Sequence, residues 1–250
     1  MKLGAVCRPL GVHLSLVAWI GLLACGAELA PLEAGDSVAG DASPLCVAPA
    51  GMGSPSTIDE VVQLLNVLPA PVTVPCLVEA LDRPLALNST SGSLSAQPAQ
   101  GVQNPRMFIF NDGLTLSIVP TGRGRDLLEL GQYEIPEESL KAELHMPVET
   151  PVTKDALYGH LRYDENITLC GVCHLDERLA PEEDHPNAYI SRAYRPREFE
   201  LVALDAVRAE HEACDEVSDP ERCAIYSAIF DHGPVVHQDF DHELPTIYNQ

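Results

Sequence analysis

Eight cysteines in a chain of 250 residues constrain its fold more than any other feature. In an exported protein cysteines pair or carry covalent groups, whereas in the cytosol they stay reduced. The compartment therefore has to be inferred before the cysteines can be assigned, and the N-terminus is the segment that indicates it.

The N-terminus predicts export. Lys2 and Arg8 precede an apolar run from Val12 to Ala24. This run is shorter than a typical transmembrane helix and has the length of the hydrophobic region of a signal peptide. We therefore expect residues 1–24 to be a signal peptide and exclude them from the fold.

The end of this run carries a second signal. Leu22-Leu-Ala-Cys25-Gly26 resembles the lipobox of bacterial lipoproteins. That resemblance implies that Cys25 becomes the N-terminus, carries the lipid and anchors the protein in the bacterial cell envelope, facing the periplasm or the cell surface. An ordinary signal peptide cleaved after another alanine is the alternative.

The net charge restricts the partners. The chain has 15 Lys and Arg against 37 Asp and Glu, a charge of −22, and without Lys2 and Arg8 the charge becomes 13 − 37, or −24. Nucleic acid is therefore excluded as a partner, and membrane contact has to come through a lipid anchor. A protein partner of so acidic a chain should present a basic face.

The first part of the mature chain divides into a tether and a folded unit. Residues 25–56 contain the lipidated cysteine and are rich in Ala, Gly, Pro and Ser, which predicts a flexible tether. Residues 57–150 should form an α+β unit, with a helix from about Ser56 to Pro69 and a short β run at 72–78. Two apolar runs around Asn111-Asp-Gly113 predict a β-hairpin.

Residues 151–250 should be mainly helical. Apolar residues at three- and four-residue steps predict a helix over 198–217. Asp219 and Pro220 then favour the start of a second helix, which should end at Gly233. The expected fold class is therefore α+β, with a small antiparallel β-rich unit followed by a mainly helical region that contains a helical hairpin.

One motif has the residue types and spacing of a known cofactor-attachment site. Cys170-Gly-Val-Cys173-His174 matches the c-type haem attachment pattern, in which two thiols bond the vinyl groups and the adjacent imidazole ligates iron. The region resembles c-type cytochromes. The resemblance implies covalent haem c on Cys170 and Cys173, His174 as proximal ligand, and electron transfer or redox sensing with a redox protein partner, rather than catalysis.

The remaining cysteines then form two pairs. Cys7 leaves with the signal peptide and Cys25 takes the lipid. Cys214 and Cys223 lie at the facing ends of the helical hairpin, so we expect them to bond. Cys46 and Cys76 are the pair left over, and their loop of about 30 residues predicts about 3–4 kcal/mol of stabilisation.

The sequence departs from the common monohaem cytochromes on the distal side, because every methionine precedes the motif. We therefore expect either bis-histidine ligation or an open sixth site. The histidines after position 174 are the first candidates, and His145 and His160 precede the motif. The acidic, histidine-rich tail from Asp231 to Glu243 is interpreted as either a divalent-metal site or, preferably, a solvated terminus.

Two other function classes remain. In a structural lipoprotein, Cys170 and Cys173 would form a disulfide. In a thiol-disulfide oxidoreductase they would be the redox pair, although the strand and helix pattern typical of that class is missing around the motif.

Overall fold

A computed structural model describes residues 46–249. The expected signal peptide, the lipidation of Cys25 and the first part of the tether lie outside the described residues. No helix within 46–249 combines the length and the apolar character needed to span a bilayer.

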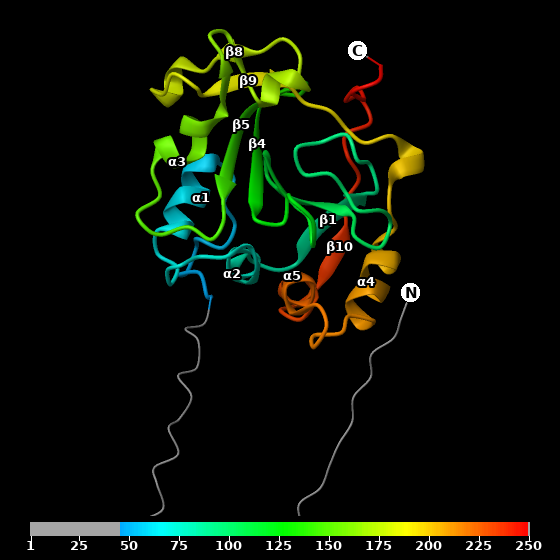
Figure 1. Ribbon diagram of the computed structural model, residues 1–250. Helices are drawn as coiled ribbons and strands as arrows, with labels where there is room; N and C mark the ends of the chain where they lie inside the picture. Colours follow the sequence, from blue (N-terminus) through cyan, green and yellow to red (C-terminus); the bar gives the residue numbers. More distant parts are fainter. Residues whose placement is uncertain (1–45, 250) are drawn as a thin grey trace, which may run out of the picture. The chain divides into compact units, whose positions relative to one another are not determined.

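Eight strands form one mixed sheet in the order β10, β1, β2, β3, β4, β5, β9, β8 (Figure 1). Neighbouring strands are antiparallel except for β1 and β10, which are parallel. The strands are β1 (Leu85–Thr90), β2 (Arg106–Asn111), β3 (Leu114–Ile118), β4 (Leu127–Ile135), β5 (Glu138–His145), β8 (Arg178–Leu179), β9 (Tyr189–Arg192) and β10 (Val235–His237). A separate pair contains β6 (Arg162–Asp164) and β7 (Ile167–Thr168).

Five α-helices accompany the sheet: α1 (Ile58–Leu65), α2 (Val74–Ala80), α3 (Lys154–Tyr158), α4 (Leu204–Glu212) and α5 (Pro220–Phe230). Short 3-10 turns complete the described chain: η1 (Gly159–Leu161), η2 (Cys170–Val172), η3 (Pro181–Glu183) and η4 (Glu198–Glu200).

The two faces of the sheet differ in chemistry because side chains alternate along each strand. On β4 and β5 the even-numbered Leu128, Leu140 and Leu144 are buried in the hydrophobic core. Helices α1, α2, α3 and α5 contribute the opposing residues of that core. The odd-numbered residues of the same strands are mostly polar, and they face away from the core.

The predicted hairpin and first helix are confirmed. Strands β2 and β3 pair across Asp112 and Gly113, whose φ angles of 26° and 85° are those that the turn sequence favours. Helix α1 begins after Thr57, whose side chain accepts a hydrogen bond from the Glu60 backbone N–H.

The predicted β run at 72–78 is wrong, because this segment contains most of helix α2. Thr73 caps the helix by accepting from the Cys76 N–H at 3.2 Å, and Pro75 occupies its first turn. A short apolar run is compatible with a buried helix or a buried strand, so periodicity alone could not separate them.

The helical hairpin and both disulfides are confirmed. Cys214 and Cys223 are bonded between the end of α4 and the first turn of α5, and Cys46 is bonded to Cys76 in α2. Helix α4 is shorter than expected and begins only at Leu204.

The expected order of a small β unit followed by a mainly helical region is wrong. The C-terminal region contributes β8, β9 and β10 to the same sheet as β1–β5. These strands have two to four residues, so they are too short for a period-two pattern to predict them.

Part of the segment assigned to a tether packs against the folded unit. Besides the Cys46 disulfide, the Asp82 N–H donates to the Gly53 carbonyl at 2.7 Å, and the Ser54 hydroxyl donates to the Asp82 carboxylate at 2.7 Å. Residues 46–56 are therefore held to the end of α2.

Candidate functional site

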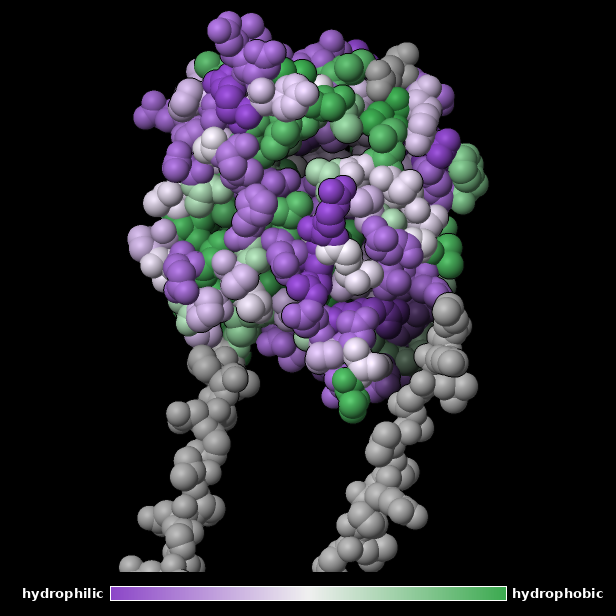
Figure 2. Space-filling model, viewed as in Figure 1, coloured by the Kyte–Doolittle hydropathy of each residue, from purple (hydrophilic) through white to green (hydrophobic). Residues whose placement is uncertain are grey.

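A cavity of about 860 Å³ lies against the polar face of the sheet. Its floor comes from β2, β3, β4 and β5, and its walls come from residues 92–96, 160–174, 193–200 and 246–248. The upper part of the surface in Figure 2 is hollowed, with hydrophobic side chains around the opening. The volume is in the upper part of the range of roughly 300–1,000 Å³ typical of ligand and cofactor sites.

Charged side chains of both signs line the sheet side of this cavity. Arg106 forms an ion pair with Glu129 and also donates to Ser117. Glu129 lies directly opposite Glu143 on the neighbouring strand. Burial raises the pKa of Glu129, while the Arg106 guanidinium opposes that rise and Glu143 adds to it.

Lys141 is a second cation on the sheet side of the cavity. Its ammonium donates to the Ser139 hydroxyl, and within residues 46–249 it has no carboxylate within salt-bridge distance. Burial lowers the pKa of Lys141 to about 8, against the raising effects of Cys170 and Glu129. A partly buried ammonium without an ion-pair partner favours an anionic group in the cavity.

The loop that contains the motif is fixed to strand β9. The Arg192 N–H donates to the Leu175 carbonyl at 3.0 Å, and the Arg192 guanidinium donates to Asp176 at 2.6 Å. The backbone N–H groups of Cys173 and His174 both donate to the Cys170 carbonyl, at 3.1 and 2.8 Å. These bonds fold the five motif residues into one tight turn.

Gly171 is required by this turn. A Cβ at this position would lie 2.6 Å from Ile167 Cγ1 and closer still to the Glu177 carboxylate. Glu177 is itself held in place, because it accepts a hydrogen bond from the Thr168 N–H at 2.8 Å. The backbone of the motif can therefore approach Glu177 only with glycine at its second position.

His174 has a defined orientation. Its Nδ1 lies 2.7 Å from the Arg192 carbonyl oxygen, and its ring stacks on Tyr194 with centroids 5.2 Å apart. A carbonyl only accepts, so Nδ1 carries the proton and Nε2 keeps its lone pair. Burial, and secondarily Lys141, lowers the pKa of His174 to about 3, so the ring is neutral.

Cys170 and Cys173 are free thiols in the described chain, while the other four described cysteines are paired. Both line the cavity together with His174. Burial raises the pKa of Cys170 to about 12. A redox-active thiol needs a lowered pKa, so this environment does not favour thiol-disulfide exchange.

The motif residues fit a covalently attached haem. Two unpaired thiols and an imidazole with a free Nε2 line one cavity of cofactor size, and the adjacent Lys141 suits an anionic substituent such as a propionate. The donor set is therefore the one that c-type attachment requires.

The histidines after the motif lie outside this cavity. His185, His211, His232 and His237 approach other carboxylates, those of Asp155, Asp231, Glu79 and Asp239. The tail histidines do not converge on a shared metal site within residues 46–249. The two that line the cavity with His174 are instead His145 and His160, which precede the motif.

Methionine is not a cavity residue in the described chain. Met107 and Met146 are buried in the hydrophobic core on the opposite face of the sheet, and Met52 packs against that core. The absence of a methionine ligand to iron stays a prediction.

Arg106, Glu129, Lys141 and Glu143 were not predicted as cavity residues, and His145 and His160 were named only as candidate histidines that precede the motif. Glu129, Lys141, Glu143 and His145 occupy odd positions of β4 and β5, alternating with buried apolar residues. Such alternation normally indicates a solvent-facing side. The sequence did contain a signal for a functional site: acidic, basic and histidine side chains are gathered on that one side of the strands.

Comparisons with known proteins give no family assignment. The chain matches no protein-family model, and no curated protein or solved structure matches it significantly. Its function therefore has to be argued from its own residues.

Proposed function

We propose that the cavity holds a haem c attached through Cys170 and Cys173, with His174 as the proximal iron ligand. The observation that carries this proposal is that all three residues line the same cavity, with both thiols unpaired and Nε2 of His174 free to bind a metal. When bound, the haem supplies a one-electron redox couple.

The chain's own residues have separate tasks in this proposal. Arg192 fixes the tautomer of His174 through its carbonyl and raises the basicity of the ligand. Tyr194 limits the rotation of the ring by stacking on it. Lys141, which has no carboxylate partner among the described residues, would compensate the negative charge of a propionate if haem is bound. The protein is then an electron carrier or redox sensor.

Among the described residues, the cavity is lined by two further histidines and by no methionine. If the haem is bound, His145 and His160 would be the candidates for a second iron ligand, in place of the histidines after the motif, and an open sixth site would be the alternative. Bis-histidine ligation lowers the reduction potential relative to Met/His ligation, and an open site would allow ligand binding.

The proposed location is the outer side of a bacterial membrane, with Cys25 lipidated. The supporting features are the apolar run of residues 12–24, the Leu22-Leu-Ala-Cys sequence and two disulfides in the folded part. With a mature charge of −24, that is 13 − 37, electron exchange is expected with a partner that has a basic face.

A pyridine haemochrome spectrum tests the proposal. The full chain is produced in a host with cytochrome c maturation machinery, and we expect about one covalent haem per chain by the attachment chemistry of the motif. Replacing both Cys170 and Cys173 with serine should abolish covalent haem. The matched control replaces Cys214 and Cys223, which form a disulfide away from the cavity.

A wild-type chain without covalent haem in that host, where a known cytochrome c is matured in parallel, would contradict the proposal. Peptide mapping would then decide the next candidate. A disulfide between Cys170 and Cys173 would favour the structural lipoprotein.

A further inference from the structure

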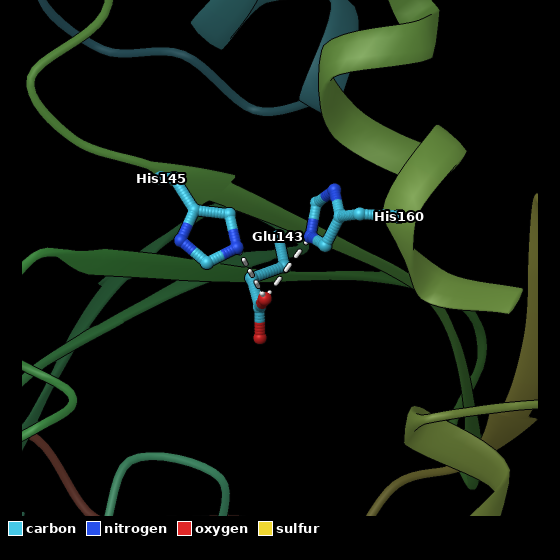
Figure 3. A group of neighbouring side chains, drawn as sticks. All are labelled: Glu143, His145 and His160. Atoms are coloured by element: carbon cyan, nitrogen blue, oxygen red, sulfur yellow. Dashed lines mark hydrogen bonds and ion pairs between the residues drawn. The ribbon is translucent and has the colours of Figure 1, made fainter. Parts of the chain in front are cut away.

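Glu143, His145 and His160 form a second group of potential ligands in the cavity wall (Figure 3). Glu143 and His145 are two residues apart and therefore on the same face of β5, and His160 comes from η1. Nε2 of His160 lies 3.0 Å from Glu143 Oε1, and Nε2 of His145 lies 3.6 Å from the same oxygen. Figure 3 shows both rings directing this nitrogen toward the carboxylate.

The spacing of the three ligand atoms suits a small cation. They all lie within 4.8 Å of one another. Bonds of roughly 2.0–2.2 Å in a tetrahedral site place ligand atoms roughly 3.3–3.6 Å apart. The observed separations therefore require only small side-chain rotations, and this is the only such group of three within residues 46–249.

The environment also favours a bound cation. The Glu143 side chain is only 12% exposed, and among residues 46–249 its ion pairs are with His145 and His160 alone. The opposite Glu129 is already paired with Arg106. His145 is 67% exposed at the side chain, which leaves an approach for an ion from solvent. The rings of His145 and His160 are in contact, with centroids 4.8 Å apart, so they are already gathered around the carboxylate.

The chemistry of the set identifies the class of ion. Two imidazoles and one carboxylate are the three protein ligands of many zinc sites that keep one position open, and of some iron(II) sites. We propose that Glu143, His145 and His160 bind a divalent transition-metal ion such as Zn²⁺, with the open position facing the cavity. This site shares no residue with Cys170, Cys173 and His174. In this proposal His145 and His160 bind the metal ion, so neither of them would ligate a haem iron.

Zinc titration calorimetry of the full mature chain, with metal content measured by elemental analysis, tests the site. We expect one Zn²⁺ per chain at this group. His145→Ala should weaken binding at least tenfold, and Glu143→Gln should do so as well. The first variant removes an exposed side chain, so its fold should be retained, which circular dichroism checks. His237→Ala, which changes an exposed tail histidine paired with Asp239, is the matched control and should bind as the wild type does.

The site would be overturned by the absence of Zn²⁺ binding in the wild type, by unchanged affinity in the His145→Ala/His160→Ala double variant, or by affinity lost only in His237→Ala. The iron spin state of haem-loaded protein provides a further test. If His160→Ala changes that spin state and the wild type binds no Zn²⁺, His160 is a ligand of the haem iron and the proposed zinc site is wrong. Haem content is measured separately, so failure of the zinc site and failure of haem attachment are distinguishable.

Discussion

His174 donates its Nδ1 proton to the carbonyl of Arg192, 18 positions later in the chain, across a distance of 2.7 Å. The bond joins the end of the cysteine motif to strand β9, which is itself paired with β5. The position of the imidazole therefore depends on the sheet that forms the cavity floor, and not only on the local turn.

Replacement of His174 should change the haem without removing it. In His174→Ala we expect covalent haem through Cys170 and Cys173 in reduced yield, with altered Soret and ligand-field bands, because the proximal nitrogen is lost. Absorption spectroscopy measures this, with His237→Ala as the control. Spectra identical to those of the wild type would contradict the assignment of His174.

The wild-type spectrum should lack the long-wavelength sulfur-to-iron band of Met/His ligation. The reason is that Met107 and Met146 lie in the core, on the other face of the sheet from the cavity. Finding that band in the oxidised protein would show the distal assignment to be wrong.

Loss of either disulfide should destabilise the fold by an amount that depends on its loop. The chain-entropy relation predicts about 3 kcal/mol for Cys214–Cys223, with a separation of 9, and about 4 kcal/mol for Cys46–Cys76, with a separation of 30. Denaturant unfolding of the two double-alanine variants measures both values. Equal stability of wild type and variants would contradict the pairing.

Gly171→Ala should lower both stability and haem yield. The added methyl would meet Ile167 and the Glu177 carboxylate, so the turn that gathers the motif residues has to open. Gly131→Ala is a control for stability, because its nearest neighbour would be Ser139 Oγ at an ordinary 3.6 Å. A Gly171→Ala protein with the wild-type melting temperature would argue against the close packing of this loop.

The start of helix α1 should give a pH-dependent contribution to stability. Hydrogen bonds from the Ser56 N–H and hydroxyl lower the pKa of Glu60 below its ordinary value. A carboxyl whose pKa is lower in the folded than in the unfolded state stabilises the fold at pH values above its unfolded-state pKa. This stabilisation is lost as the pH falls through its folded-state pKa. The melting temperature of Glu60→Gln should therefore be below that of the wild type at about pH 7, and the difference should become smaller as the pH falls below the ordinary glutamate pKa of about 4.3. A difference that is independent of pH would exclude the carboxylate as its cause, and Glu149→Gln, at an exposed position, is the control.

Lipidation at Cys25 has a cellular test. Cys25→Ser should move the mature protein from the membrane fraction to the soluble fraction, because the only proposed membrane contact is the lipid. Unchanged retention in the membrane fraction would remove the lipid from the proposal.

The sequence predicted best where local chemistry decides the structure. Asp112-Gly113 fixes the turn of the β2 and β3 hairpin, and Asp219 with Pro220 fixes the start of α5. It failed at α2, where a short apolar run is compatible with either element, and at β9 and β10, whose pairing depends on distant strands.

For the site, the motif residues were predictable from their spacing and the wall opposite them was not. Lys141, Glu143 and His145 look like a solvent-facing strand in the sequence. That face of the strand lines a cavity only because other segments, including residues 246–248, cover it. The histidines after the motif were the first candidates in the sequence, but position along the chain does not determine which side chains share a cavity.

The parallel pairing of β10 with β1 has a consequence for how the chain reaches its fold. Leu85 pairs with Val235, so β1 gains β10 as its outer neighbour only after residues 235–237 have been synthesised. A chain truncated before residue 235 would leave the backbone groups of β1 exposed as an unpaired edge, which is a template for aggregation. Pairing between residues so far apart in the sequence also predicts slow folding. The newly made chain would therefore depend on β10 for protection from aggregation.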